Sequence, residues 1–303
     1  MKGAVIGIRL AVGLMLLAPA AALSQADRYA PTILQLAPTP RAATFGSTTV
    51  ARDIEAIFGN PALLGVAPGT VVGAGRFDAA THLTLASSAS LGPFSVGIGA
   101  QHLAASTQLI ALPSANWSYS LQLGGPTAVS SSVGAFGLSM QFRGNRIGAA
   151  FKYVEQRTGP LDDGVPSLDL GLARDVSRYL VGVTVQNIGA GIHFPTSSAQ
   201  LPLRVSAGVS SYGWAVGPLD LNGSAGVSVL PDGIVRPAFG LEAAYVPMEG
   251  YNFAVRGGVR RPEFRAQRPL TLGASAALDR FALEYAWEDW DRGRTHRLAL
   301  RVR

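Results

Sequence analysis

The stretch DRFALEYAWEDWDRGRTHRLALRVR, residues 279–303, carries the pattern that decides the fold. Between residues 281 and 288, large apolar side chains occupy every second position, and small or acidic side chains lie between them. After a polar turn at 289–294 the alternation resumes, with leucine and valine on one face and arginine and alanine on the other. Because side chains alternate between the two faces of an extended strand, the stretch predicts a β-hairpin with one apolar face.

The same alternation recurs from residue 69 to the last residue, with turn residues between the apolar runs. Gly144-Asn145 is expected to form one of the two-residue turns. The pattern predicts about fourteen to sixteen strands, at 70–77, 82–89, 94–102, 116–123, 133–142, 146–155, 167–174, 179–187, 203–210, 214–221, 224–229, 236–246, 251–260, 270–278, 280–288 and 296–303.

Soluble β-sandwiches and membrane β-barrels both show this alternation of side chains, and composition separates these two classes. The chain has 303 residues, of which 48% are hydrophobic and 15% are charged, against roughly 25% charged in an ordinary soluble protein. No apolar run after residue 23 approaches the ~18 residues of a transmembrane helix. A soluble β-sandwich with an ordinary aromatic core is the alternative. We expect an all-β fold instead, a transmembrane antiparallel β-barrel of about 14 strands, closed because hydrocarbon cannot satisfy an open sheet edge.

Several classes of function lose support from residue usage. The chain has no cysteine, which excludes thiol catalysis and cysteine-ligated metal sites. No two of the four histidines, His82, His102, His193 and His296, have the spacing of a metal site. The net charge of +6 comes from scattered arginines rather than from a basic stripe, so no nucleic-acid partner is expected. We expect no enzyme activity, no catalytic residue, no metal and no cofactor.

The N-terminal part departs from the strand pattern. Residues 1–26 have the positive start, short apolar core and small residues of a secretory signal peptide. Residues 27–66 do not alternate; a short helix is expected near 53–58, ended by Gly59-Asn60-Pro61. Three parts are therefore expected, namely the signal peptide at 1–26, an N-terminal plug segment at 27–66 and the barrel at 67–303.

Motifs in that segment resemble a known family of membrane barrels. The stretches RAATFG (41–46), VARD (50–53) and AIFGNPAL (56–63) are similar to the start of the PorV/PorQ family, which is related to FadL-type long-chain fatty acid transporters. VRGGVR (255–260) and THRL (295–298) resemble the closing strands of the same family. One departure is the final residue, Arg303, where many such barrels have an aromatic residue.

The resemblance implies a barrel of roughly fourteen strands whose lumen is blocked by the N-terminal segment. Carried over, Asn60, Pro61 and Ala62 become plug residues, and Asp53 and Arg41 become partners that hold the plug in place. In FadL-like barrels the plug gates the passage of hydrophobic molecules, whereas PorV-like barrels work with a protein-secretion machine.

Charged residues on the small-residue faces are expected to point into the lumen and to form ion pairs across neighbouring strands, because an unpaired charge there would be costly. One hypothesis is that Glu284 pairs with Arg297 or Arg301 across the last hairpin. The predicted lumen charges are Lys152, Arg204, Glu242, Arg256, Glu284, Arg297 and Arg301.

Three functional readings follow, all placing the protein in the lipid of a bacterial outer membrane. The first is a barrel that binds or passes hydrophobic small molecules. The second is an accessory barrel that docks secretion-machinery proteins through outer loops at 156–166 and 187–202. The third is a passive structural barrel. Transport predicts a continuous apolar pocket between plug and wall, whereas the accessory reading predicts a sealed lumen and a protein partner.

Overall fold

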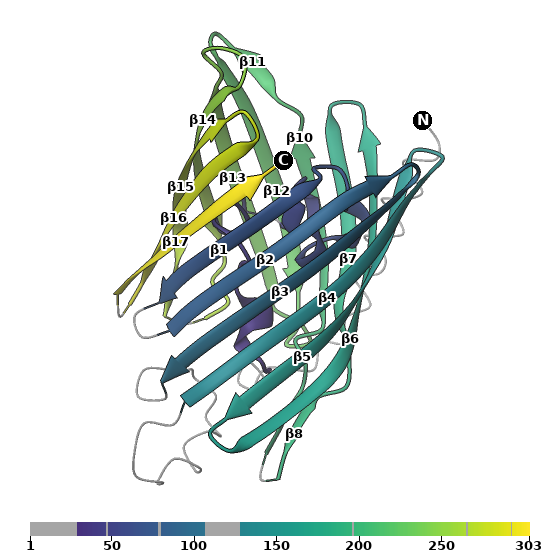
Figure 1. Cartoon of the computed structure of the whole chain (residues 1–303), viewed down its shortest axis with the longest axis vertical. Helices are drawn as coiled ribbons and strands as arrows, with labels where there is room; N and C mark the ends of the chain where they lie inside the picture. The colour runs from purple at the N-terminus through teal and green to yellow at the C-terminus, as the bar shows by residue number, and fades with distance from the viewer. Residues whose placement is uncertain are drawn as a thin grey trace.

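The computed structural model describes residues 29–46, 48–77, 80–106, 128–195, 197–264, 266–291 and 293–303. The expected signal peptide at 1–26 and the expected strand at 116–123 lie outside these residues. Figure 1 shows the strands wrapped into one barrel. They are β1 (Gly69–Phe77), β2 (Ala80–Leu91), β3 (Phe94–Ser106), β4 (Ala128–Phe142), β5 (Asn145–Thr158), β6 (Leu161–Val176), β7 (Tyr179–Gly189), β8 (Ile192–Phe194), β9 (Ser197–Ala199), β10 (Arg204–Ser211), β11 (Trp214–Val216), β12 (Leu219–Val229), β13 (Val235–Tyr245), β14 (Tyr251–Arg260), β15 (Gln267–Leu278), β16 (Phe281–Trp290) and β17 (Gly293–Val302).

The sheet closes on itself through antiparallel pairing of its first and last strands. β1 pairs with β17 from Thr70↔Val302 to Phe77↔Thr295, and β10 pairs with β12 where β11 continues the same ladder. Counting β10 and β11 as one interrupted strand, the described residues form a closed barrel of 14 antiparallel strands. The predicted all-β barrel of about 14 strands is confirmed.

The outer face is apolar because every second side chain points away from the lumen. Leu241 is 71% exposed and Val255 is 62% exposed, whereas Glu242 and Arg256, one position further along each strand, are buried. A soluble sandwich would bury its large apolar side chains between two sheets. Here they form the outer surface of a closed ring, which suits hydrocarbon and argues against the sandwich.

Several sequence boundaries were wrong. The expected strand 214–221 crosses a turn at Gly217, whose φ of 60° reverses the chain, so its second half belongs to β12. The turn predicted at Gly144-Asn145 is formed by Arg143 and Gly144, both with positive φ, and Asn145 begins β5.

The two expected docking loops are also largely strand. Residues 156–166 are the tip of the β5–β6 hairpin, paired from Gln156↔Asp163 to Thr158↔Leu161. The segment 187–202 contains the small β8–β9 hairpin. These strands extend beyond the apolar band of the barrel, and their polar residues led the sequence analysis to predict loops there.

The barrel has two unlike ends. Two-residue turns at 92–93, 143–144, 177–178, 217–218 and 279–280 lie at the end that holds the C-terminus, called here the inner end, and one at 159–160 lies at the opposite end. The connection at 190–203 lies at the opposite, outer end. The wall is also uneven in height, since β4, β5 and β6 have 15, 14 and 16 residues and β14, β16 and β17 have 10 each (Figure 1).

Candidate functional site

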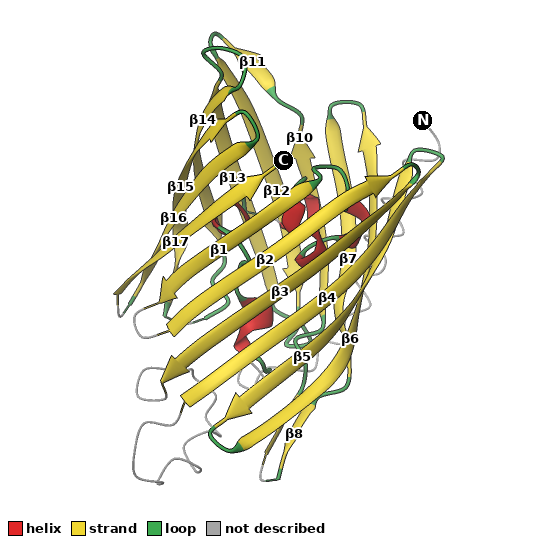
Figure 2. Ribbon diagram, in the orientation of Figure 1, coloured by secondary structure: helices red, strands yellow, loops and turns green. Residues whose placement is uncertain are grey.

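The N-terminal segment, defined here as residues 29–66, lies inside the barrel, as Figure 2 shows by its helices within the ring of strands. Its short helices are η1 (Thr32–Gln35), α2 (Pro40–Thr44), η2 (Thr48–Val50), η3 (Ile54–Phe58) and η4 (Pro61–Leu63). η3 and η4 contact β1–β6, η2 contacts β7, β10 and β12, and α2 contacts β14–β17. The segment therefore contacts the wall on all sides. None of the helices in the described part of the chain is long and apolar enough to cross a membrane.

Asn60-Pro61-Ala62 forms a capped turn at the centre of this segment. The fully buried Asn60 accepts a hydrogen bond from the backbone N–H of Ala62 at 3.1 Å, and its amide nitrogen donates to the carbonyl oxygen of Thr49 at 2.8 Å. Pro61 occupies the first position of η4, where its missing N–H costs nothing. A longer contact of 3.5 Å joins the Asn60 amide to the carbonyl oxygen of Leu172 in β6. The motif thus fixes the segment internally and reaches the wall.

Arg41 and Asp53 contact each other and the wall. Arg41 Nε lies 2.9 Å from Asp53 Oδ2, and Arg41 Nη1 lies 3.2 Å from Glu242 Oε2 in β13. Asp53 also caps η3 and contacts Arg301 of β17. Together with Glu55, Arg256 and Glu284 these residues form one group near the inner end. We call it the ion cluster: Arg41, Asp53, Glu55, Glu242, Arg256, Glu284 and Arg301.

The ion cluster contains more acid than base. Within the cluster four carboxylates face three guanidinium groups, and Arg280 and Arg303 line the cavity beside it. Glu55 is buried, and its Oε1 accepts a hydrogen bond from the hydroxyl of Thr39 at 2.5 Å. Burial, followed by the negative charge of Glu284, raises the pKa of Glu55 to about 7. Glu55 therefore holds its proton over much of the range in which ordinary glutamates are ionised.

The other predicted lumen charges also lie in pairs. Glu284 Oε1 is 3.2 Å from Arg301 Nη2, whereas the alternative partner Arg297 lies 2.9 Å from Glu288. Arg297 also donates to the carbonyl oxygen of Ala37 in the N-terminal segment at 2.6 Å. The remaining pairs are Lys152–Asp169 at 2.5 Å, Arg204–Glu263 at 3.0 Å and Arg256–Glu242.

Sequence reasoning missed several of the partners. Arg236, Arg260 and Glu288 fall on the same strand faces as Glu242, Arg256 and Glu284, so the period of two would have found them. Glu263 lies in a loop and Glu55 in a helix, where that period gives no information.

Lumen-facing glycines let the wall approach the N-terminal segment closely. A Cβ at Gly148 would overlap the backbone of Pro61 and Ala62, and one at Gly182 would lie 2.8 Å from the carbonyl oxygen of Thr49. Further wall glycines face the segment in the same way: Gly97, Gly99, Gly137, Gly171, Gly240, Gly258 and Gly273. At these positions the wall therefore leaves room for the segment that a larger side chain would fill.

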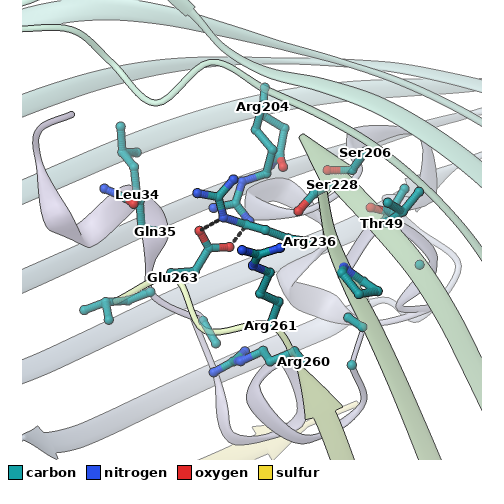
Figure 3. Close-up of a pocket in the computed structure, with 18 of the residues that line it drawn as sticks. Leu34, Gln35, Thr49, Arg204, Ser206, Ser228, Arg236, Arg260, Arg261 and Glu263 are labelled. Atoms are coloured by element: carbon teal, nitrogen blue, oxygen red, sulfur yellow. Dashed lines mark ion pairs between the residues drawn. The ribbon is translucent and has the colours of Figure 1, made fainter. Parts of the chain in front are cut away.

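The lumen beside the segment is uneven in polarity. An apolar cluster of Ile33, Leu103, Val133, Val154, Val165, Ile192 and Leu201 lies between η1 and the tall side of the wall. Across the lumen, a cavity of about 90 Å³ lies between η1 and β10, β12 and β13, and it is lined mainly by polar side chains (Figure 3). A second polar cavity of about 80 Å³ adjoins the ion cluster. Among the described residues, no three histidine, aspartate or glutamate side chains are arranged so that they could hold a metal ion.

No protein-family model matches the chain, and no curated protein matches it. Solved structures match over nearly their full length. The toluene transporter TbuX of Ralstonia pickettii is 14% identical with a TM-score of 0.55, covering 88% of this chain and 98% of that one. The toluene transporter TodX of Pseudomonas putida is 10% identical with a TM-score of 0.57, covering 88% and 96%. A FadL homologue of Pseudomonas aeruginosa is 12% identical with a TM-score of 0.50, covering 88% and 97%. At these identities the likeness establishes a shared FadL-type barrel fold.

Proposed function

We propose that this chain is an outer-membrane channel that binds and passes small hydrophobic molecules, with the N-terminal segment as its plug. The observation that carries the proposal is a lipid-compatible barrel closed around its own N-terminal segment. The segment contacts the wall on all sides and is fixed by Asn60. The structural neighbours that share this fold include toluene transporters, which supports hydrophobic molecules as the substrate class.

The apolar cluster between η1 and β3–β6 supplies the receiving surface in this proposal. It lies toward the outer end, where the longest described connection, 190–203, leaves the wall. Short turns of such barrels face the periplasm, so the outer end would face the outside of the cell. A hydrophobic molecule would reach the apolar cluster first and would pass further only when the plug shifts.

The accessory role in protein secretion, of the PorV type, is the second candidate. One observation favours it: the two cavities described above, of about 90 and 80 Å³, are mainly polar, and neither forms an apolar passage. In that role the lumen stays sealed and the outer rim binds a partner protein.

Entry of toluene into vesicles with lipopolysaccharide in the outer leaflet separates the two candidates. The channel is expected to accelerate toluene entry, while a charged solute of similar size stays outside. Asn60→Ala should change the toluene rate, because it loosens the plug, with folding checked by heat-shifted mobility on gels. A folded wild-type barrel that leaves toluene entry unchanged would overturn the channel. Co-purification of a stoichiometric partner protein would then favour the accessory role.

A further inference from the structure

Most of the charged residues that line the polar cavity beside η1 are arginines. Arg204 of β10, Arg236 of β13, Arg260 of β14 and Arg261 of the following loop all line it, and Glu263 is the acidic residue among its described lining residues. Figure 3 shows the guanidinium groups of Arg204, Arg236 and Arg261 converging around Glu263. Three strands and one loop thus bring positive charge to one small space.

The carboxylates within reach do not balance these guanidinium groups. Glu263 is shared by Arg204 at 3.0 Å and Arg236 at 3.4 Å, and Asp232 also contacts Arg236. Glu288 contacts Arg260 but is shared with Arg297. Four of these guanidinium groups line the cavity, and Arg297 lies beyond it. The five are matched by three carboxylates among the described residues, which leaves two positive charges in surplus.

Some donors around the cavity also have no acceptor. Arg204 Nη2 and Arg260 Nε are buried atoms without a hydrogen-bond partner in the described structure. Arg261 forms no ion pair among the described residues, and its exposed guanidinium group donates to the carbonyl oxygen of Val235 at 3.4 Å. Buried donors normally find acceptors, so this arrangement is suited to a group that supplies several acceptor oxygens and negative charge.

We infer that this cavity binds a tetrahedral oxyanion with two negative charges, the phosphate or sulfate type of group. Two charges match the surplus of two. Guanidinium groups bind such oxygens through charge-assisted and often bidentate hydrogen bonds. Because the donors approach from separate strands, an anion with three or more oxygens satisfies them better than a planar carboxylate with two. The cavity of about 90 Å³ also exceeds the room that one water needs.

This inference does not depend on the proposed passage of hydrophobic molecules. A barrel that fails to conduct toluene can still bind the anion, and a conducting barrel can fail to bind it. A negative result in the toluene experiment and a negative result in the anion-binding experiment therefore count against different proposals.

Calorimetric titration of the detergent-solubilised full chain with inorganic phosphate, at constant ionic strength, tests the inference. Saturable binding is expected. Arg261→Gln should weaken it about tenfold, since it removes one charge-assisted contact and breaks no described ion pair. Glu263→Gln should have the opposite effect and strengthen binding, because it frees Arg204 and Arg236. Arg268→Gln is the matched control, since Arg268 is exposed at the same end and pairs with Asp291 instead.

The inference is overturned by any of three results. The first is the absence of saturable phosphate binding. The second is equal phosphate affinity of Arg261→Gln and Arg268→Gln. The third is displacement of bound phosphate by acetate at the concentration at which sulfate displaces it. Titration with glycerol 3-phosphate then identifies the source of the bound group. Tighter binding than inorganic phosphate supports the phosphoester of an organic molecule, and weaker binding supports the free anion.

Discussion

At the scale of the residue, Glu55 distinguishes the ion cluster from an ordinary set of salt bridges. Arg301 Nη2 lies 3.4 Å from Glu55 and 3.2 Å from Glu284, so one guanidinium group serves two acids. A protonated Glu55 leaves three carboxylates against three guanidinium groups. Ionisation would add a buried charge beside Glu284, and such a charge is costly without a partner of its own.

This leads to a pH dependence of stability. Because the pKa of Glu55 rises on folding from 4.5 to about 7, its contribution is fully present below pH 4.5 and is lost as pH rises through 7. The loss is on the order of 3–4 kcal/mol, from ~1.4 kcal/mol per unit of pKa shift. Glu55→Gln should flatten the dependence of the urea midpoint on pH between 5 and 8. The exposed Glu249→Gln is the control, and a Glu55→Gln profile as steep as that control contradicts the assignment.

The same residues show what sequence could predict at this scale. Arg41, Asp53 and Asn60 were singled out by a family motif, and the structure brings Arg41 and Asp53 to 2.9 Å from each other. Glu55 lies between them in sequence but has no periodicity to mark it. Its role depends on Glu284 and Arg301, more than 200 residues away, and only the closed ring brings those side chains together.

At the scale of the element, the N-terminal segment and the wall are matched through glycine. Strand glycines usually weaken a strand, yet the lumen-facing glycines named above lie where the backbone or a side chain of the segment approaches the wall. The alternation predicted strands and faces well, because a period of two is a local property. It could not predict which lumen glycines matter, since that depends on where a non-strand segment lies inside the ring.

Gly148→Ala and Gly134→Ala form a matched pair on neighbouring strands. A Cβ at Gly148 overlaps Pro61 and Ala62, whereas one at Gly134 meets nothing within 4 Å. Gly148→Ala should lower the free energy of unfolding by about 1–3 kcal/mol, as overpacking does, and should increase protease cleavage within residues 29–66. Gly134→Ala should change neither. Equal behaviour of the two variants would show that the segment is not held against β5.

At the scale of the whole molecule, the apolar outer face shows that the barrel is suited to lipid. Leu241 lies at the middle of β13 and Val235 at its outer end, and both point outward. Composition predicted this architecture because apolar residues are diluted one in two around the whole ring. The height of the wall was not predicted, since β4–β6 continue past the apolar band with polar residues that resemble a loop.

Lysine substitutions on β13 should report depth in the membrane. Leu241→Lys is expected to lower the free energy of unfolding in lipid vesicles by about 2–4 kcal/mol, and Val235→Lys by about 0–1 kcal/mol, because the cost of a lipid-facing charge falls toward the interface. Urea titration of both variants measures the difference. A cost that is the same at both positions would contradict a membrane-spanning β13.

The contact between Arg297 and the carbonyl oxygen of Ala37 joins residues 260 positions apart. Arg301 likewise reaches Asp53 and Glu55 from the last strand. The last hairpin is synthesised after the N-terminal segment, so the segment can make these contacts only once that hairpin exists. The segment is therefore expected to reach its final arrangement in the step in which β1 pairs with β17 and closes the ring.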